Sequence, residues 1–100
     1  MPWIDLPVCI FEQRDKVVKA KIVDVAPHLA HIMTFAVHRQ KFLLDDCWRV
    51  SNVETGFCVK HELDGETMDE AITNCRKYLS DVTPAMASKS MRKAAKQGAI

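Results

Sequence analysis

Two alternating segments joined by a glycine-containing turn constrain the fold of this chain more than any other feature. Residues 47–53 and 57–61 alternate apolar with polar side chains, and residues 54–56 separate them. This pattern predicts a β-hairpin in which the glycine adopts the positive φ of a bulged turn. Trp48 and Phe57 are expected to meet across the pair, since aromatic and β-branched pairs stabilise a sheet.

Two segments near the start of the chain also have β-strand character. Residues 8–13 and 17–25 are rich in β-branched and aromatic side chains, and the polar residues 14–16 between them predict a turn. In the second segment Lys19 and Lys21 alternate with apolar residues. We therefore expect a half-buried strand with both lysines pointing to water.

The next segment permits two interpretations. Pro27 interrupts the preceding strand pattern, because proline lacks the amide donor and restrains its neighbour. Residues 31–39 then alternate and predict a third strand, while the apolar spacing within residues 29–36 also fits a short helix. The aromatic and β-branched content favours the strand, and residues 40–46 predict a connection.

Two helices are expected after these strands. Thr67 and Glu70 have the spacing of a capping box, so a helix is predicted over about 67–80, with one apolar stripe facing the sheet. A Thr-Pro pair then predicts a second helix over about 84–97. Beside its basic face runs a narrow stripe, formed by Met86, Ser90 or Met91, Ala94 and Ala95.

Strands followed by helices indicate an α+β fold. We predict an antiparallel sheet of four to five strands over about residues 8–61, followed by the two C-terminal helices. A chain of 100 residues is short enough that residues 1–100 are expected to form a single domain. A homodimer and a monomer are both compatible with an open sheet edge and a small-residue stripe.

The charge is unevenly distributed along the chain. The formal net charge is +1, but residues 1–83 hold 10 basic and 13 acidic side chains, whereas residues 84–100 hold four basic side chains and no acidic one. Such a basic end is typical of a contact with nucleic acid or an acidic partner, and also of an ordinary solvated helix face.

Sequence patterns also bear on location and chemistry. The N-terminal residues lack the features of a secretory signal and no apolar run has the length of a membrane span, so we expect a cytoplasmic protein whose four cysteines stay reduced. His28 and His31 form a close pair without a second pair of ligands nearby, so no metal site is expected. Since the chain has no glycine-rich phosphate loop and no nucleophile motif, we expect neither a cofactor nor catalytic activity.

Residues 48–59 followed by residues 67–72 resemble small phage and prophage proteins, in which a Trp-led strand, a Thr-Gly hairpin and a Thr-x-x-Glu-Ala helix occur together. Compact α+β proteins of this group include anti-CRISPR proteins, which are stoichiometric inhibitors that occupy a surface of a defence complex. The resemblance implies a phage-encoded binding protein without catalytic activity that acts in the host cell cytoplasm. Its expected partner is a host defence protein or ribonucleoprotein complex, blocked by steric occlusion.

The hairpin and helix also resemble the arm-type DNA-binding domains of phage integrases, in which a sheet enters the major groove. That resemblance implies a basic hairpin face, to which Arg49 and Lys60 would contribute. Glu54 and Glu62 flank these residues, and a mixed surface of this kind is poorly suited to phosphate contacts. DNA binding is therefore the alternative function.

The predicted partner-binding residues are basic side chains of the tail and sheet together with one tryptophan. Trp3 is included because tryptophan and arginine are enriched at interface hot spots. The set comprises Lys89, Arg92, Lys93 and Lys96 of the basic end, Lys19, Lys21 and Arg49 of the sheet, and Trp3.

Overall fold

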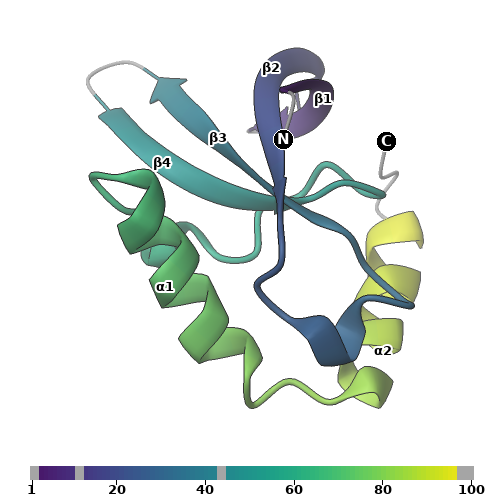
Figure 1. Cartoon of the computed structure of the whole chain (residues 1–100). Helices are drawn as coiled ribbons and strands as arrows, with labels where there is room; N and C mark the ends of the chain where they lie inside the picture. Colours follow the sequence, from purple (N-terminus) through teal and green to yellow (C-terminus); the bar gives the residue numbers. More distant parts are fainter. Residues whose placement is uncertain (1–2, 11–12, 43–44, 97–100) are drawn as a thin grey trace.

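The computed structural model describes residues 3–10, 13–42 and 45–96. It has a four-stranded antiparallel sheet followed by two C-terminal helices, which confirms the predicted α+β fold (Figure 1). The elements are β1 Ile4–Ile10, β2 Gln13–Val23, the 3-10 helix η1 Pro27–Leu29, β3 Phe35–Phe42, β4 Asp45–Asn52, the 3-10 helix η2 His61–Leu63, α1 Met68–Leu79 and α2 Pro84–Lys96.

The sheet is a meander in which each strand pairs with its neighbour in the sequence, in the order β1-β2-β3-β4. One row of paired residues runs across all four strands, from Ile4 to Ala20, from Ala20 to His38 and from His38 to Arg49. Because side chains alternate between the two faces of a strand, this register fixes which residues share a face.

Each face of the sheet carries its own apolar cluster. On the face covered by α1, buried Val37 and Val50 pack with the helix residues Ala71 and Cys75. The opposite face carries a second buried cluster, formed by Leu6, Val8, Ala20 and Ala36. Both faces therefore contribute to the core, although helices cover only one of them.

The sequence signals for α1 are confirmed. The Thr67 hydroxyl accepts a hydrogen bond from the Glu70 amide at 3.1 Å, as a helix N-cap does. The predicted stripe faces the sheet, and Ala71, Cys75 and Leu79 are buried. In Figure 1 the helix runs alongside β4 and β3, against which it packs.

The entry into α1 leaves no space for a side chain at Gly65. A Cβ atom there would lie 2.6 Å from the Ala71 amide nitrogen, closer than real Cβ contacts. The same glycine exchanges two backbone hydrogen bonds with Trp48, at 2.7 and 3.0 Å, so the segment before α1 is held against β4.

The predicted turn at residues 14–16 is wrong, because these residues belong to β2. Val8 pairs with Lys16 and Ile10 pairs with Gln13, and residues 11–12 lie outside the described part of the chain. The predicted connection over residues 40–46 is also wrong, because β3 continues to Phe42 and β4 begins at Asp45. Ladder pairing is a backbone interaction, so polar residues can extend two strands that already pair through their apolar parts.

The segment predicted as a strand over residues 31–39 becomes extended only at Phe35. Before it, the amides of Ile32 and Met33 both donate to the Leu29 carbonyl at 2.9 Å. The part of this segment with helical spacing therefore forms one turn after η1, and the alternating part forms β3.

The hairpin turn has its expected glycine, since Gly56 has φ 77°. Its second arm does not become a fifth strand, because Cys58 makes only an isolated bridge to Ser51 before the chain enters η2 at His61. The sheet therefore has four strands, the smaller of the two numbers predicted.

The start of α2 is confirmed, with the Met86 amide donating to the Thr83 hydroxyl at 3.2 Å. Met86 itself was predicted in the packing stripe and is 53% exposed, whereas Ala87 is 2% exposed. The prediction is therefore wrong for Met86, whose place on the inward side of α2 is taken by Ala87, beside Met91 and Ala94 of the predicted stripe. This places a small side chain where α2 meets the core around Leu79.

Candidate functional site

Two tryptophans and two cations gather on one exposed part of the sheet surface. The side chains of Trp3, Lys19, Arg39 and Trp48 line one shallow depression, which we call the tryptophan face. They come from the residue before β1, from β2, from β3 and from β4, so all four strands are needed to assemble it. Arg39 and Trp48 are directly paired across β3 and β4.

The aromatic rings of the tryptophan face contact each other. The ring centroids of Trp3 and Trp48 lie 6.4 Å apart with an interplanar angle of 37°, within the range of favourable aromatic pairs. Trp3 is 48% exposed, whereas Trp48 is half-buried against the helix-side cluster. One ring is therefore anchored in the core while the other remains largely open to solvent.

Arg39 is fixed between Trp48 and an acidic side chain. Its Cζ atom lies 5.9 Å from the Trp48 ring centroid, in cation–π range. Its Nε and Nη2 atoms each donate to the Asp46 carboxylate at 2.8 Å. The hydrogen bond and the charge of Asp46 raise the pKa of Arg39. The guanidinium is thus held in one orientation, because two parallel hydrogen bonds to one carboxylate restrict its rotation.

The other cation of the tryptophan face also has an acidic partner. Lys19 forms an exposed ion pair with Asp5 on the neighbouring β1. With both cations compensated, the tryptophan face presents aromatic surface with little net charge.

Arg49 does not reach an open surface, which corrects the expectation that it is an exposed sheet residue. Its Nε and Nη2 atoms donate to the Asp64 carboxylate at 3.0 and 2.7 Å. The two side chains are only 17% and 16% exposed. Burial lowers the pKa of Arg49, but the hydrogen bonds and charge of Asp64 outweigh burial, so the pKa is raised overall. The sequence could not show this, because Asp64 lies outside the sheet.

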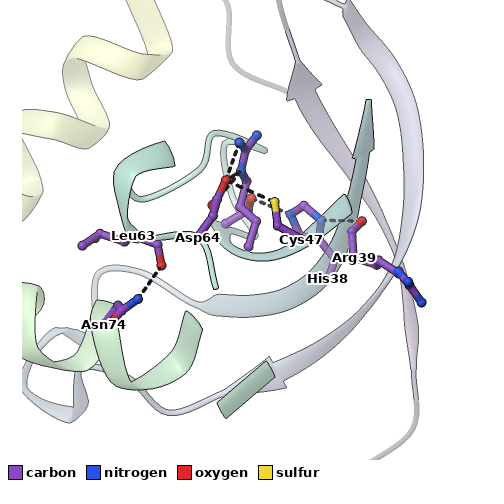
Figure 2. A network of polar contacts seen from close by, with 8 residues as sticks. His38, Arg39, Cys47, Leu63, Asp64 and Asn74 are labelled. Carbon is purple, nitrogen blue, oxygen red and sulfur yellow. Dashed lines mark hydrogen bonds and ion pairs between the residues drawn. The ribbon is translucent and has the colours of Figure 1, made fainter. Parts of the chain in front are cut away.

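Asp64 also joins a polar network beside the sheet (Figure 2). The Cys47 thiol donates to Asp64 at 3.5 Å, and Asn74 of α1 donates to the Leu63 carbonyl at 3.2 Å. These contacts tie Leu63, at the end of η2, to α1, and Asp64, the next residue, to β4. The network is therefore a structural joint between the sheet and the helix.

His38 lies fully buried within β3. Its Nε2 atom is 2.8 Å from the Ser51 hydroxyl, and its Nδ1 atom is 3.3 Å from the Arg39 carbonyl oxygen. A carbonyl can only accept, so Nδ1 carries the proton and Nε2 accepts from Ser51. Burial lowers the pKa of His38, so the neutral form is favoured.

Cys58 and Cys75 are free thiols. Burial raises the pKa of Cys58, and it raises the pKa of Cys75 to about 12. Since the thiolate is the reactive form, these two thiols are poor nucleophiles in their folded environment.

The predicted basic residues fall on separate elements. Lys19 and Lys21 lie on β2, whereas the tail cations lie on α2, whose buried residue Ala87 faces the core. All four tail cations are exposed, and none forms an ion pair with another described residue. They are Lys89, Arg92, Lys93 and Lys96.

The structure thus joins Trp3 and Lys19 to two residues that the predicted set lacked. The feature that could have identified Arg39 and Trp48 as neighbours is the register between β3 and β4, which pairs these two residues directly. Trp48 was expected to serve hairpin packing, and it does pack against the core while also lining the tryptophan face.

No protein-family model, curated protein or solved structure matches the chain. Among residues 3–10, 13–42 and 45–96, no group of three or more His, Cys, Asp or Glu side chains is placed to hold a metal ion. Within the same ranges, neither helix has the length and apolar character needed to cross a membrane.

Proposed function

We propose that this protein is a non-catalytic binding protein that uses the tryptophan face to cover a surface of a partner protein. The observation that carries the proposal is the exposed Trp3 ring, held against Trp48 beside an oriented Arg39. Tryptophan and arginine are the residues most enriched at binding hot spots, and a pre-oriented side chain loses less entropy on binding.

The size of the expected contribution follows from the exposure of Trp3. A tryptophan side chain offers about 150–250 Å² of surface, so the 48% that is exposed leaves roughly 100 Å² for a partner to cover. At about 25 cal/mol per Å², this burial contributes about 2.5 kcal/mol. Loss of the ring would then weaken binding by roughly 50-fold.

The charge of the tryptophan face favours a protein partner. Lys19 and Arg39 already pair with Asp5 and Asp46, so they offer little net attraction to a phosphate backbone. In line with the resemblance to small phage proteins, we propose a host defence protein or ribonucleoprotein complex as the partner. Inhibition would result from steric occlusion of its nucleic-acid or partner surface.

A phage-plaquing assay tests this proposal. Bacteria with active CRISPR immunity of several types would be challenged with phage, with and without this protein, and the protein would be co-purified from the same cells. Restored plaquing together with a co-purified effector is expected. No restoration and no bound effector would overturn the assignment to the anti-CRISPR kind.

Variants connect the activity to the tryptophan face. Trp3→Ala is expected to weaken binding to the captured effector by roughly 50-fold, as worked out above. The matched control is Met86→Ala, which removes an apolar side chain that is 53% exposed on α2. Equal affinity of both variants would show that the partner binds elsewhere.

DNA binding remains a second candidate because of α2. Its four exposed cations form no ion pairs with the described residues, and the helix contains no acidic residue. Four phosphate contacts would give a slope of about −3.6 in log K against log salt. A salt titration with random duplex DNA, repeated with Arg92→Glu and Lys93→Glu combined, distinguishes this function from partner occlusion.

A further inference from the structure

An apolar cleft lies between the end of α1, α2 and the segment that follows β4. Its volume is about 170 Å³. Its lining includes several aromatic and sulfur-containing side chains, among them Met33, Phe35, Phe57, Cys58 and Met91. The cleft involves none of the four residues of the tryptophan face.

The size and lining of the cleft suit a single aromatic ring. An engineered apolar cavity of about 150 Å³ binds benzene, so a space of 170 Å³ can hold one ring. Methionine sulfur atoms make favourable contacts with aromatic rings, and Met33 and Met91 both line the space.

The buried polar groups of the cleft wall are already paired within the protein. The Asn52 side-chain amide donates to the Thr34 carbonyl at 3.2 Å and to Glu54 at 3.0 Å, and its oxygen accepts from the Thr55 amide at 2.9 Å. The interior therefore offers a ligand apolar contact rather than unsatisfied hydrogen-bonding groups.

A cation, in contrast, lies next to one of the lining residues, Tyr78. Tyr78 lines the cleft and is 42% exposed, and the Lys60 ammonium lies 5.5 Å from the centroid of its ring. Lys60 forms an exposed pair with Glu62 at 3.5 Å. Exposed pairs of this kind are weak, so a ligand carboxylate can share the ammonium.

We infer that this cleft binds an aryl carboxylate, with the ring among Met33, Phe57 and Met91 and the carboxylate beside Lys60. The chemistry that fits is a phenylpropionate unit. A free aromatic acid has this unit, and so does a peptide that ends in phenylalanine.

The test is an NMR titration of the methionine methyl groups in the intact protein. 3-Phenylpropionate is expected to shift the methyl signals of Met33 and Met91 and to leave that of Met86 on the outer side of α2 unchanged. The neutral 3-phenylpropanamide should bind about threefold more weakly, the size expected for one exposed charge contact. An N-acetylated dipeptide ending in phenylalanine, run as a separate arm, distinguishes the two sources of the ligand.

Lys60→Met tests the role of this cation while keeping the apolar stem of the side chain. It should abolish the preference for the acid over the amide, whereas Lys89→Met, which removes an exposed cation from α2, should preserve that preference. Ala94→Leu, which fills part of the cleft, should weaken the binding of both ligands. Absence of methyl shifts with about 10 mM of either ligand, a concentration above the dissociation constant of several mM that about 0.3 kcal/mol per heavy atom gives, would overturn the inference. Equal binding of acid and amide to the unmodified protein would overturn the role of Lys60.

Discussion

Replacing Asp64 by asparagine should destabilise the protein far more than an ordinary loss of an ion pair. Arg49 would keep its position but lose the carboxylate that receives its Nε and Nη2 hydrogen bonds. Removing one partner of a fully buried pair costs about 3–5 kcal/mol, and removing one from an exposed pair costs less than about 1 kcal/mol. Since the two side chains are 17% and 16% exposed, we expect Asp64→Asn to lower the free energy of unfolding by about 2–3 kcal/mol.

Urea unfolding, followed by circular dichroism, measures this change. With a slope of about 1 kcal/mol per M, the midpoint should fall by roughly 2–3 M. The control is Asp5→Asn, which breaks the exposed pair with Lys19 and should change stability by less than about 1 kcal/mol. Replacing Arg49 and Asp64 together by apolar residues should recover much of the loss, because no charge is then left unpaired. If Asp64→Asn proved no more destabilising than Asp5→Asn, the joint between sheet and helix would not depend on this ion pair.

Two further predictions concern buried positions. Burial lowers the pKa of His38 in the folded protein, so below the ordinary value of 6.5 the unfolded chain binds more protons than the folded one. The free energy of unfolding should therefore fall as the pH drops below about 6.5. The decrease should reach up to about 1.4 kcal/mol per pH unit until the pKa of the folded state is reached. A histidine NMR titration checks this directly, and a His38 ring that became charged near pH 6.5 while the protein stayed folded would contradict it. Gly65→Ala should destabilise the protein by about 1–3 kcal/mol, because the added Cβ meets the backbone of α1 at Ala71. A thermal melt of this variant within experimental error of the unmodified protein would show that the entry to α1 can shift to make room.

The sequence predicted the fold class because its strongest signals are local. The positive φ of Gly56, the N-cap at Thr67 and the stripe of α1 each depend on a few neighbouring residues, and each is present in the structure. Residues 14–16 were misassigned because a polar run can serve equally as a turn or as part of a paired strand, and only pairing with β1 decides. Met86 was misassigned because Met86 and Ala87 both fit the helical spacing of the stripe, and only packing against the core shows that Ala87 is the buried one.

The candidate site was less accessible to prediction. Trp3 could be identified as an interface candidate, but its contact with Trp48 depends on the register of four strands. Arg49 was expected among the partner-binding residues of the sheet, yet it is held by Asp64 in a largely buried pair, and Arg39 lies on the tryptophan face instead. Sequence alone fixes neither the strand register nor the acidic partner that each arginine meets.

The meander order of the sheet links binding to folding. Trp3 precedes the first strand and Trp48 lies on the last, so the two rings meet only in a chain whose four strands have all assembled. A partner that contacts both rings therefore binds the native chain and not a partly folded one. By mass action, such a partner at about 100 times its dissociation constant would add about 2.7 kcal/mol to the stability of the whole sheet. Occupancy by the partner would consequently also protect the N-terminal strand from unfolding and proteolysis.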